Sequence, residues 1–457
     1  MHKFVSIFKN KEIVGRIFFT IMIFFVIRIG AAICVPLVKP TAELASAMES
    51  GNALALMNLL GGGALSNFSV FALGVSPYIT AQIIVELLSK DVLPALTELS
   101  KQGQYGRKKI EMATRYLCLL LGAVQGYGII KTMENSSYIE FIDASMQGSF
   151  WSYAYIITVL LAGTMLCLWL GDQITEKGLG NGISVIIFAG CVRSIPLQIS
   201  RAFEKWVLVN VGHGDQAVIR GSFQFALYIF AFLLIVSGVV FFELARRKIP
   251  VQHAGKGGQN PSMAQASFLP IKVNSAGVIP VIFASSILMA PQVIASFISP
   301  EAGNANWLKI FSYTEMFVMP GINGSTWSMP WGLLIYLALI IAFTFFYSEM
   351  QMDPETMADN FQKNGSYIPG IRPGKQTERY VRKVLNRVTF IGAFALAAIA
   401  CIPVALTLSG IFGADTSLAI GGTGMIIVVG VCIELNSQID GLLAGKSFEE
   451  VQAGGGL

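Results

Sequence analysis

Two stretches, Gly74-Val-Ser-Pro-Tyr-Ile-Thr-Ala81 and Gly277-Val-Ile-Pro-Val-Ile-Phe-Ala284, share Gly, Val, Pro, Ile and Ala at the same offsets, each inside a long apolar run. Proline removes a backbone donor and kinks a helix. In hydrocarbon such a break is tolerated only where it faces protein or a water-filled cavity. Paired breaks in two halves of a chain are typical of inverted-repeat membrane transporters with a working site between the halves. The repeat therefore predicts a path through a membrane.

The composition indicates a polytopic membrane protein. Of 457 residues, 54% are apolar and 13% charged, and the mean hydropathy is +0.63; a soluble domain would carry about twice that charge. Runs long enough to cross a hydrocarbon core of about 30 Å lie near 17–37, 68–89, 116–133, 153–173, 183–203, 223–243, 275–298, 332–350, 388–409 and 419–436. We expect an all-α fold of ten transmembrane helices in two pseudo-symmetric inverted halves.

The basic residues predict the orientation. With the N-terminus in the cytoplasm, 24 of the 32 lysines and arginines fall on the cytoplasmic side, seven fall outside, and Arg28 lies within the first span. Cytoplasmic loops carry such an excess of basic residues. The sequence therefore predicts that both termini are cytoplasmic, and the net charge of +5 is a topology signal rather than a sign of nucleic-acid binding.

The expected domain organisation follows from these spans. The segments are an amphipathic N-terminal segment at 1–16, an N-terminal half at 17–203, an external connection at 204–222, a C-terminal half at 223–440 and a cytoplasmic tail at 441–457. The C-terminal half contains two long cytoplasmic loops, 244–274 and 351–387, whose turn chemistry and charge suit either a docking surface or solvated connectors that set the topology. Leu59-Leu-Gly-Gly-Gly-Ala-Leu-Ser-Asn-Phe68 is too short and glycine-rich to span, which favours a re-entrant half-helix over a flexible external turn.

Enzymatic signatures are absent from the sequence. It has no G-x-x-x-x-G-K-[ST] phosphate loop, no nucleophile elbow and no H-E-x-x-H motif. Its six cysteines are scattered through apolar spans without a C-x-x-C pair, and its three histidines are far apart. We expect no enzyme activity, no cofactor and no metal site. Energy for any uphill movement must come from a partner, an ion gradient or the membrane potential.

The broken segments carry branched aliphatic residues rather than charges. Val75 and Ile79 lie in the second span, Ile282 lies in the seventh, and Ile183 and Ile187 lie one turn apart in the fifth. Ordinary core packing explains each residue taken alone. An aliphatic constriction can, however, gate by dewetting and seal around a varied object. Together with the two breaks, the pattern favours a polymer over an ion as the transported species.

Motifs along the whole chain resemble those of the SecY family, whose members form the central subunit of the bacterial protein-conducting channel. The strings that carry the resemblance are Gly62-Gly-Ala-Leu-Ser66, Phe71-Ala-Leu-Gly74 with Pro77-Tyr-Ile79, Gly106-Arg-Lys-Lys109, Thr114-Arg-Tyr116, Trp169-Leu-Gly171, Gln173-Ile-Thr-Glu176, Gly180-Asn-Gly-Ile-Ser184, Lys272-Val-Asn274 with Gly277-Val-Ile-Pro280, Ile368-Pro-Gly-Ile-Arg-Pro-Gly374 and Gly421-Gly-Thr423.

The resemblance implies roles for particular residues. A pore ring would comprise Val75, Ile79, Ile183, Ile187, Ile282 and Ile427. A re-entrant plug helix around 60–73 would include Gly62, Gly63, Ala64, Leu65, Ser66 and Phe68. A lateral gate between spans two and three and spans seven and eight would include Thr80, Ile83, Gln125, Ile287 and Ala290. Motor or ribosome docking would use Arg246, Arg247, Lys248, Lys256, Arg372 and Lys375.

The resemblance also implies partners and a location. We expect a channel subunit in the bacterial cytoplasmic membrane that passes unfolded secretory polypeptides across it and releases transmembrane segments into lipid. Its partners would be SecE-like and SecG-like small subunits, the SecA motor ATPase, the ribosome, signal sequences, nascent chains and lipids, without a nucleic-acid substrate. Ala290 replaces a larger residue common at the gate, and Lys256 is the one basic residue between Lys248 and Lys272. A small-solute carrier and an assembly scaffold without a conduit remain alternatives.

Overall fold

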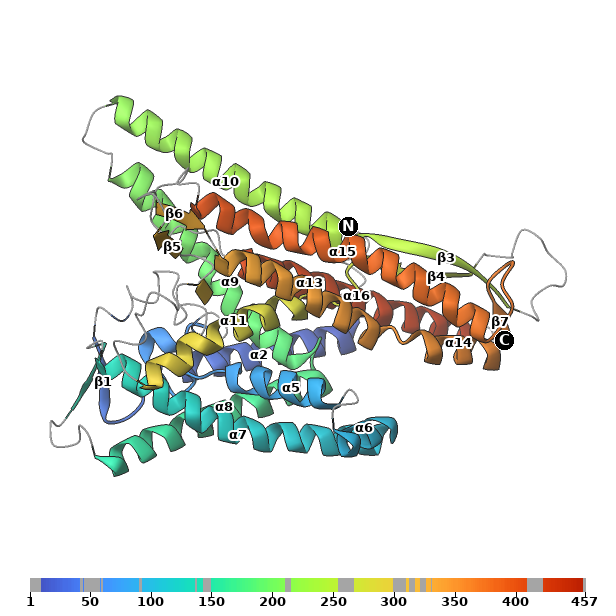
Figure 1. Ribbon diagram of the computed structural model, residues 1–457, viewed down its shortest axis with the longest axis horizontal. Coiled ribbons are helices and arrows are strands. Elements are labelled where there is room, and N and C mark those ends of the chain that lie inside the picture. The colour runs from blue at the N-terminus through green and yellow to red at the C-terminus, as the bar shows by residue number, and fades with distance from the viewer. Residues whose placement is uncertain are drawn as a thin grey trace.

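The computed structural model describes residues 10–41, 44, 58, 61–89, 93–135, 138–142, 149–209, 215–253, 267–298, 310–311, 317–320, 326–329, 331–408 and 422–454. Helices dominate these residues, and we refer to the elements up to α9 as the N-terminal half and to those from α10 onward as the C-terminal half. Figure 1 shows helices α5, α7 and α8 of the N-terminal half in its lower part, and helices α10, α13 and α15 of the C-terminal half in its upper part.

The N-terminal half contains the elements α2 (Lys11–Gly30), β1 (Val38–Pro40), η1 (Leu65–Asn67), α5 (Ser76–Ser89), α6 (Pro94–Lys101), α7 (Gln104–Asn135), β2 (Ile139–Phe141), α8 (Phe150–Lys177), α9 (Gly182–Phe203) and the π-helical turn η3 (Glu204–Leu208). The C-terminal half contains α10 (Asp215–Leu244), β3 (Arg246–His253), β4 (Ser267–Lys272), α11 (Ile279–Ile298), β5 (Phe317–Pro320), β6 (Thr326–Met329), α13 (Trp331–Gln351), α14 (Pro354–Lys363), β7 (Ser366–Tyr367), α15 (Lys375–Leu408) and α16 (Gly422–Gly454).

Eight described segments are long and apolar enough to cross a membrane. They correspond to the first, third to sixth and eighth to tenth expected spans. The second expected span is α5, which has 14 residues, and the seventh is α11, which has 20. The two elements outside the set of eight are therefore those that carry the glycine–proline repeat, and the total of ten spans stays a prediction.

The repeat marks the start of a helix in both halves rather than a kink within one. Gly74 and Gly277 adopt φ values of 53° and 66°, in the left-handed region that favours glycine. Pro77 and Pro280 then occupy the second residue of α5 and α11. At the first turn of a helix proline loses no backbone hydrogen bond. The expected kink is thus replaced by an abrupt helix start that shortens α5.

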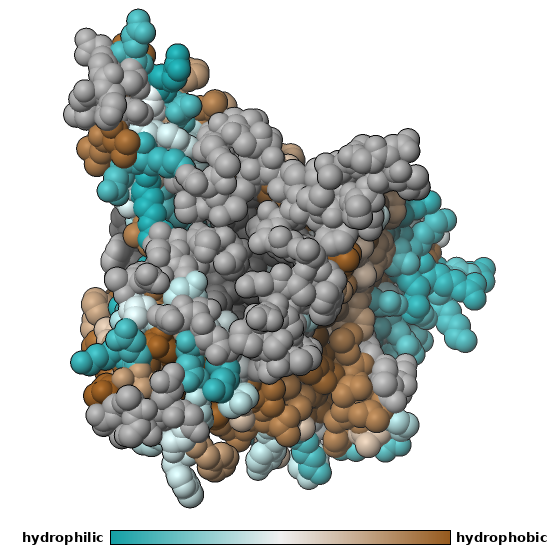
Figure 2. Space-filling view, turned by 60° about the vertical axis from the view of Figure 1, so that its left-hand side comes forward, coloured by the Kyte–Doolittle hydropathy of each residue, from teal (hydrophilic) through white to brown (hydrophobic). Residues whose placement is uncertain are grey.

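Apolar side chains cover the outside of the molecule as well as its core. Exposed examples on α2 and α10 include Phe18, Phe25, Phe223, Phe230 and Phe241. In the space-filling view, hydrophobic side chains form a broad area on the lower right flank, and hydrophilic ones gather at the edges (Figure 2). Such a surface suits hydrocarbon rather than water, because large exposed apolar patches are rare on soluble monomers.

The two long loops predicted to be cytoplasmic fold into one body. Strand β3 pairs antiparallel with β4, and the end of β3 pairs with β7, where Gln252 lies opposite Tyr367. Ile249, Ile271 and Leu385 belong to a hydrophobic cluster that joins these strands to α15. In Figure 1 this sheet, α14 and α6 lie at the right-hand end, whereas β1, β5 and β6 lie toward the left.

Candidate functional site

The expected ring residues meet in one apolar cluster. Val75, Ile79, Ile187, Ile282 and Ile427 are buried in the same hydrophobic core, and Ile183 is partly buried against it. They come from the turn before α5 and from α5, α9, α11 and α16, so both halves contribute. Branched aliphatic side chains from α5, α9, α11 and α16 thus share one apolar cluster, and we call the six expected ring residues the aliphatic junction.

A turn-rich segment, residues 61–75, leads into this junction. Ala64, Leu65 and Phe68 are fully buried. The helical element between residues 61 and 75 is the single turn η1. The backbone N–H of Val35 donates to the carbonyl of Phe68, at 3.0 Å, and that of Val70 donates to the carbonyl of Ile33, also at 3.0 Å. The part of the segment at Phe68–Val70, which we call its far end, is therefore paired with the chain that leaves α2.

The other end of the same segment, at Gly62 and Gly63, lies against α9, and we call it the near end or tip. Gly62 and Gly63 have φ values of 73° and 78°, which only glycine adopts readily. Ser66 caps this turn, because its backbone N–H donates to the Asn58 side chain at 3.0 Å and its hydroxyl donates to the Gly63 carbonyl at 2.7 Å. Arg193 of α9 donates to the same carbonyl at 3.1 Å. The segment is thus held at both ends.

The expected gate residues lie on α5, α7 and α11, the helices that pack across the contact between the halves. Helix α11 packs against α7 and α5. Ile83 is buried, Ile287 packs against the central cluster, and the Thr80 hydroxyl donates to the Ser76 carbonyl in its own helix. The Gln125 side-chain oxygen is buried and accepts no hydrogen bond among the described residues. The backbone of Ala290 lies in α11, and its side chain is outside the described residues.

One polar contact across this boundary was not expected from the sequence. The Tyr347 hydroxyl of α13 donates to the Glu86 carboxylate of α5 at 2.6 Å, and the Gln82 amide donates to the same carboxylate at 2.8 Å. Tyr347 is buried, and its ring lies edge-on to Phe283 of α11. The Glu86 carboxylate therefore connects the two halves.

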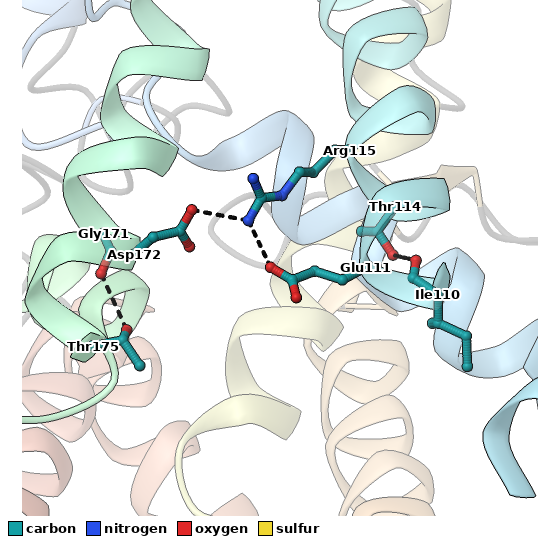
Figure 3. A network of polar contacts seen from close by, with 7 residues as sticks. All are labelled: Ile110, Glu111, Thr114, Arg115, Gly171, Asp172 and Thr175. Carbon is teal, nitrogen blue, oxygen red and sulfur yellow. Dashed lines mark hydrogen bonds and ion pairs between the residues drawn. The ribbon is translucent and has the colours of Figure 1, made fainter. Parts of the chain in front are cut away.

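An ion-pair network stiffens the N-terminal half. Arg115 of α7 contacts Glu111 of the same helix at 2.6 Å and Asp172 of α8 at 2.9 Å (Figure 3). The close-up also shows the Thr175 hydroxyl turned toward the Gly171 carbonyl, to which it donates. One terminal nitrogen of Arg115 makes both contacts, so this partly exposed ion pair links α7 to α8. Asp172 thus connects α8 to α7.

The glycine-rich turn between α8 and α9 is tied to three helices. Thr20 of α2 accepts from the Leu179 backbone at 3.2 Å, Thr175 of α8 accepts from Gly182 at 2.9 Å, and Gln438 of α16 accepts from Gly180 at 2.8 Å. A Cβ on Gly182 would overlap the Gly171 carbonyl. The motif Gly180-Asn-Gly-Ile-Ser184 therefore fixes the start of α9 and connects it to the C-terminal half.

The buried carboxylate of Glu243 fixes the turn before α11. The Asn274 amide donates to Glu243 of α10 at 2.5 Å and to the Gly277 carbonyl at 3.0 Å. Both side chains are buried. Asn274 therefore determines where the second copy of the repeat begins.

The expected docking residues are exposed where the structure describes them. Arg246, Arg247 and Lys248 lie on β3, and Arg372 and Lys375 lie before and at the start of α15. Lys256 lies outside the described residues. Within the part of the chain that the structure describes, no group of three His, Cys, Asp or Glu side chains could hold a metal ion. The polar contacts reported above join helices and turns to one another.

Comparison with known families agrees with this geometry. The SecY family profile matches residues 69–436. The chain belongs to the SecY family. It is similar to the protein translocase subunit SecY of Bacillus subtilis (42% identity over 450 residues, covering 98% of this chain and 99% of that protein). It is also similar to the same subunit of Staphylococcus epidermidis (41% identity over 446 residues, covering 98% of each). The family resemblance expected from the motifs is confirmed, and the chain is a multi-pass membrane protein.

Solved structures share the SecY fold at low sequence identity. A structure of a protein-conducting channel aligns with a TM-score of 0.65 and 18% identity, covering 93% of this chain and 91% of that one. Sec61 in the canine ribosome–channel complex aligns with a TM-score of 0.62 and 17% identity, covering 93% and 91%. These likenesses confirm the helical channel fold that the sequence predicted.

Proposed function

We propose that this SecY-family chain is the channel-forming subunit that passes unfolded secretory polypeptides across the cytoplasmic membrane and releases transmembrane segments sideways into lipid. The observation that carries the proposal is the aliphatic junction, to which α5, α9, α11 and α16 of both halves contribute. Its residues, Val75, Ile79, Ile183, Ile187, Ile282 and Ile427, act as the pore ring. An uncharged constriction excludes water and ions yet accepts side chains of many kinds.

The segment that leads into the junction is the plug. It comprises Gly62, Gly63, Ala64, Leu65, Ser66 and Phe68. Ala64 lies in the same apolar cluster as the ring residues, and Leu65 and Phe68 are buried in a neighbouring cluster. The short hydrogen-bonded turn is compact enough to move as a unit. Displacement of the plug by an entering chain opens the path, and its return closes it.

The boundary formed by α5 and α7 on one side and α11 and α13 on the other is the lateral gate, with Thr80, Ile83, Gln125, Ile287 and Ala290 along it. Apolar packing dominates this boundary, and such contacts separate into lipid at low cost because lipid tails replace them. A sufficiently apolar signal sequence can therefore insert between the two halves, where its contacts replace those that the halves make with each other.

The folded body of the two long loops is the docking surface for a driving partner. Exposed Arg246, Arg247, Lys248, Arg372 and Lys375 present basic charge at one end of the molecule. Lys256 is assigned to the same surface from the family resemblance alone. This charge suits the ribosome or an ATPase motor of the SecA type. Related channels of this fold have been solved on the ribosome. SecE-like and SecG-like subunits cover the outer apolar helices, both termini are cytoplasmic, and the chain itself has no catalytic role or cofactor.

Crosslinking of a stalled secretory chain tests the proposal. Single cysteines at Ile79 or Ile282, in a background without the six native cysteines, are expected to form an adduct with a cysteine in the stalled chain. A matched cysteine at Phe230, exposed on the outer face of α10, is the control and should form none. A small-solute carrier or a scaffold without a conduit would give no adduct at any position.

A further inference from the structure

Beyond the ring and plug, Arg193 occupies an unusual place in the N-terminal half. It lies on α9, six residues beyond the ring residue Ile187, which corresponds to roughly 9 Å along the helix axis. Its guanidinium is half-buried and donates to the Gly63 carbonyl at 3.1 Å. Among the described residues it makes no ion pair. The positive charge is thus directed at a backbone oxygen of the plug.

The surrounding backbone is shaped to receive this guanidinium. A Cβ on Gly63 would overlap the Arg193 side chain, and a Cβ on Gly62 would contact the Gly190 backbone at 3.9 Å. Gly190 lies one helical turn before Arg193, so both lie on neighbouring parts of one α9 face. Two successive left-handed glycines therefore allow the tip of the plug to approach α9 closely.

The contacts at the two ends of the plug differ in kind. The far end is held by backbone pairing of Phe68 and Val70 with Val35 and Ile33. The near end is held to α9 by the one charged hydrogen bond from Arg193. Backbone pairing to a neighbouring segment can persist during a swing of the tip, whereas the contact of Arg193 must break when the tip leaves α9.

We propose that Arg193 is a positioning residue that latches the tip of the plug to α9 in the closed channel through the Gly63 carbonyl. The inference rests on the proposed function, since it assumes that residues 60–73 form the plug. A charge-assisted hydrogen bond is roughly twice as strong as a neutral one, so the latch favours closure. A polypeptide that enters the ring displaces the tip and leaves the guanidinium facing the path.

The test is the ion leak of resting channels reconstituted in planar bilayers. R193M keeps an unbranched apolar side chain and removes the charge and the donors, so we expect a rise in leak of about tenfold, the factor that one lost charged hydrogen bond produces. R193K keeps the charge and a donor and should restore most of the seal. R201M, which removes an arginine from the same helix two turns further on, should leave the leak unchanged.

The possible outcomes separate the latch from the conduit. A parental leak in R193M beside a raised leak in the ring variant I187N would overturn the latch and leave the conduit intact. Parental conductance in all variants, including I187N, would refute the proposed conduit. It would therefore also refute the latch, which depends on the conduit. If R193M does not insert, R193Q replaces it, and equal leak in R193Q, R193K and parent overturns the latch.

Discussion

The Tyr347 hydroxyl donates a hydrogen bond of 2.6 Å to the Glu86 carboxylate, across the boundary between the two halves. Tyr347 belongs to α13 and Glu86 to α5, and 261 positions separate them. Hydrogen bonds to charged groups contribute roughly 1.5–3 kcal/mol. Separation of α5 from α13 must break this bond and leave a partly buried carboxylate with one donor fewer. The contact therefore opposes opening of the proposed gate.

Removal of the Tyr347 hydroxyl should make opening easier. In Y347F we expect secretory proteins with weakened signal sequences to be exported about tenfold better, the factor that corresponds to roughly 1.4 kcal/mol. The measurement is export of a reporter with a graded series of signal hydrophobicity. The ring of Tyr347 and its contacts with Phe283 are preserved in this variant.

The next residue of α13 supplies the control for this prediction. Ser348 hydrogen-bonds Thr389 at 2.6 Å, a contact within the C-terminal half. S348A removes a buried hydrogen bond without touching the boundary, so its export profile should match that of the parent. Equal profiles for Y347F and S348A would show that the Tyr347 contact does not restrain the gate.

Gly182 should tolerate no side chain. In G182A the added Cβ overlaps the Gly171 carbonyl, so α8 and α9 must move apart. Overpacking of this kind costs typically 1–3 kcal/mol, and a lower thermal midpoint of the purified protein in detergent measures it. G238A on α10 is the control, because an added Cβ there meets nothing within 4 Å and alanine favours a helix more than glycine. A midpoint of G182A equal to that of G238A contradicts the close approach.

Asn274 should be needed for the stability of the C-terminal half. N274A leaves the buried Glu243 carboxylate and the Gly277 carbonyl without this donor. An unsatisfied buried group costs about 1–3 kcal/mol, which thermal unfolding should detect. S275A changes the neighbouring, partly exposed residue, whose hydroxyl donates to the Lys272 carbonyl, and should have little effect. The interpretation fails if both variants unfold at the temperature of the parent.

Polar replacement of the ring should weaken its seal. Ile187 and Ile427 are buried in the central cluster. In I187N and I427N, a polar side chain retains water in the constriction, so resting ion leakage should rise and signal-sequence discrimination should relax. The asparagine variant of Val192, which is exposed on α9, is the matched control. Parental conductance in both ring variants would support an assembly scaffold without a conduit.

Much of the fold could be predicted because the signals are local. Apolar runs located the eight segments that are long and apolar enough to span, as well as α5 and α11, which carry the glycine–proline repeat. Its conformation was predicted incorrectly, since proline kinks a helix interior but begins a helix when it lies in the first turn. Gly74 adopts a left-handed backbone conformation three residues before Pro77, so the helix begins at this point and the proline lies in its first turn.

Contacts between distant parts of the chain could not be predicted. Tyr347 with Glu86 and Gly180 with Gln438 join residues more than 250 positions apart, and neither spacing nor composition identifies such partners. The pairing of β3 with β7 also joins two loops that are far apart in the sequence, and it could not be predicted for the same reason. The Arg193 contact with Gly63 was also missed, although an arginine in an apolar span is a functional signal in membrane proteins.

The most direct test of the conduit is a structure of this chain, with its partners, holding a stalled secretory polypeptide. The account predicts extended density between α5, α9, α11 and α16, with Ile79, Ile187, Ile282 and Ile427 around it and residues 61–68 displaced from α9. A stalled chain bound elsewhere, with this ring still closed and Gly63 still against Arg193, would contradict the central claim.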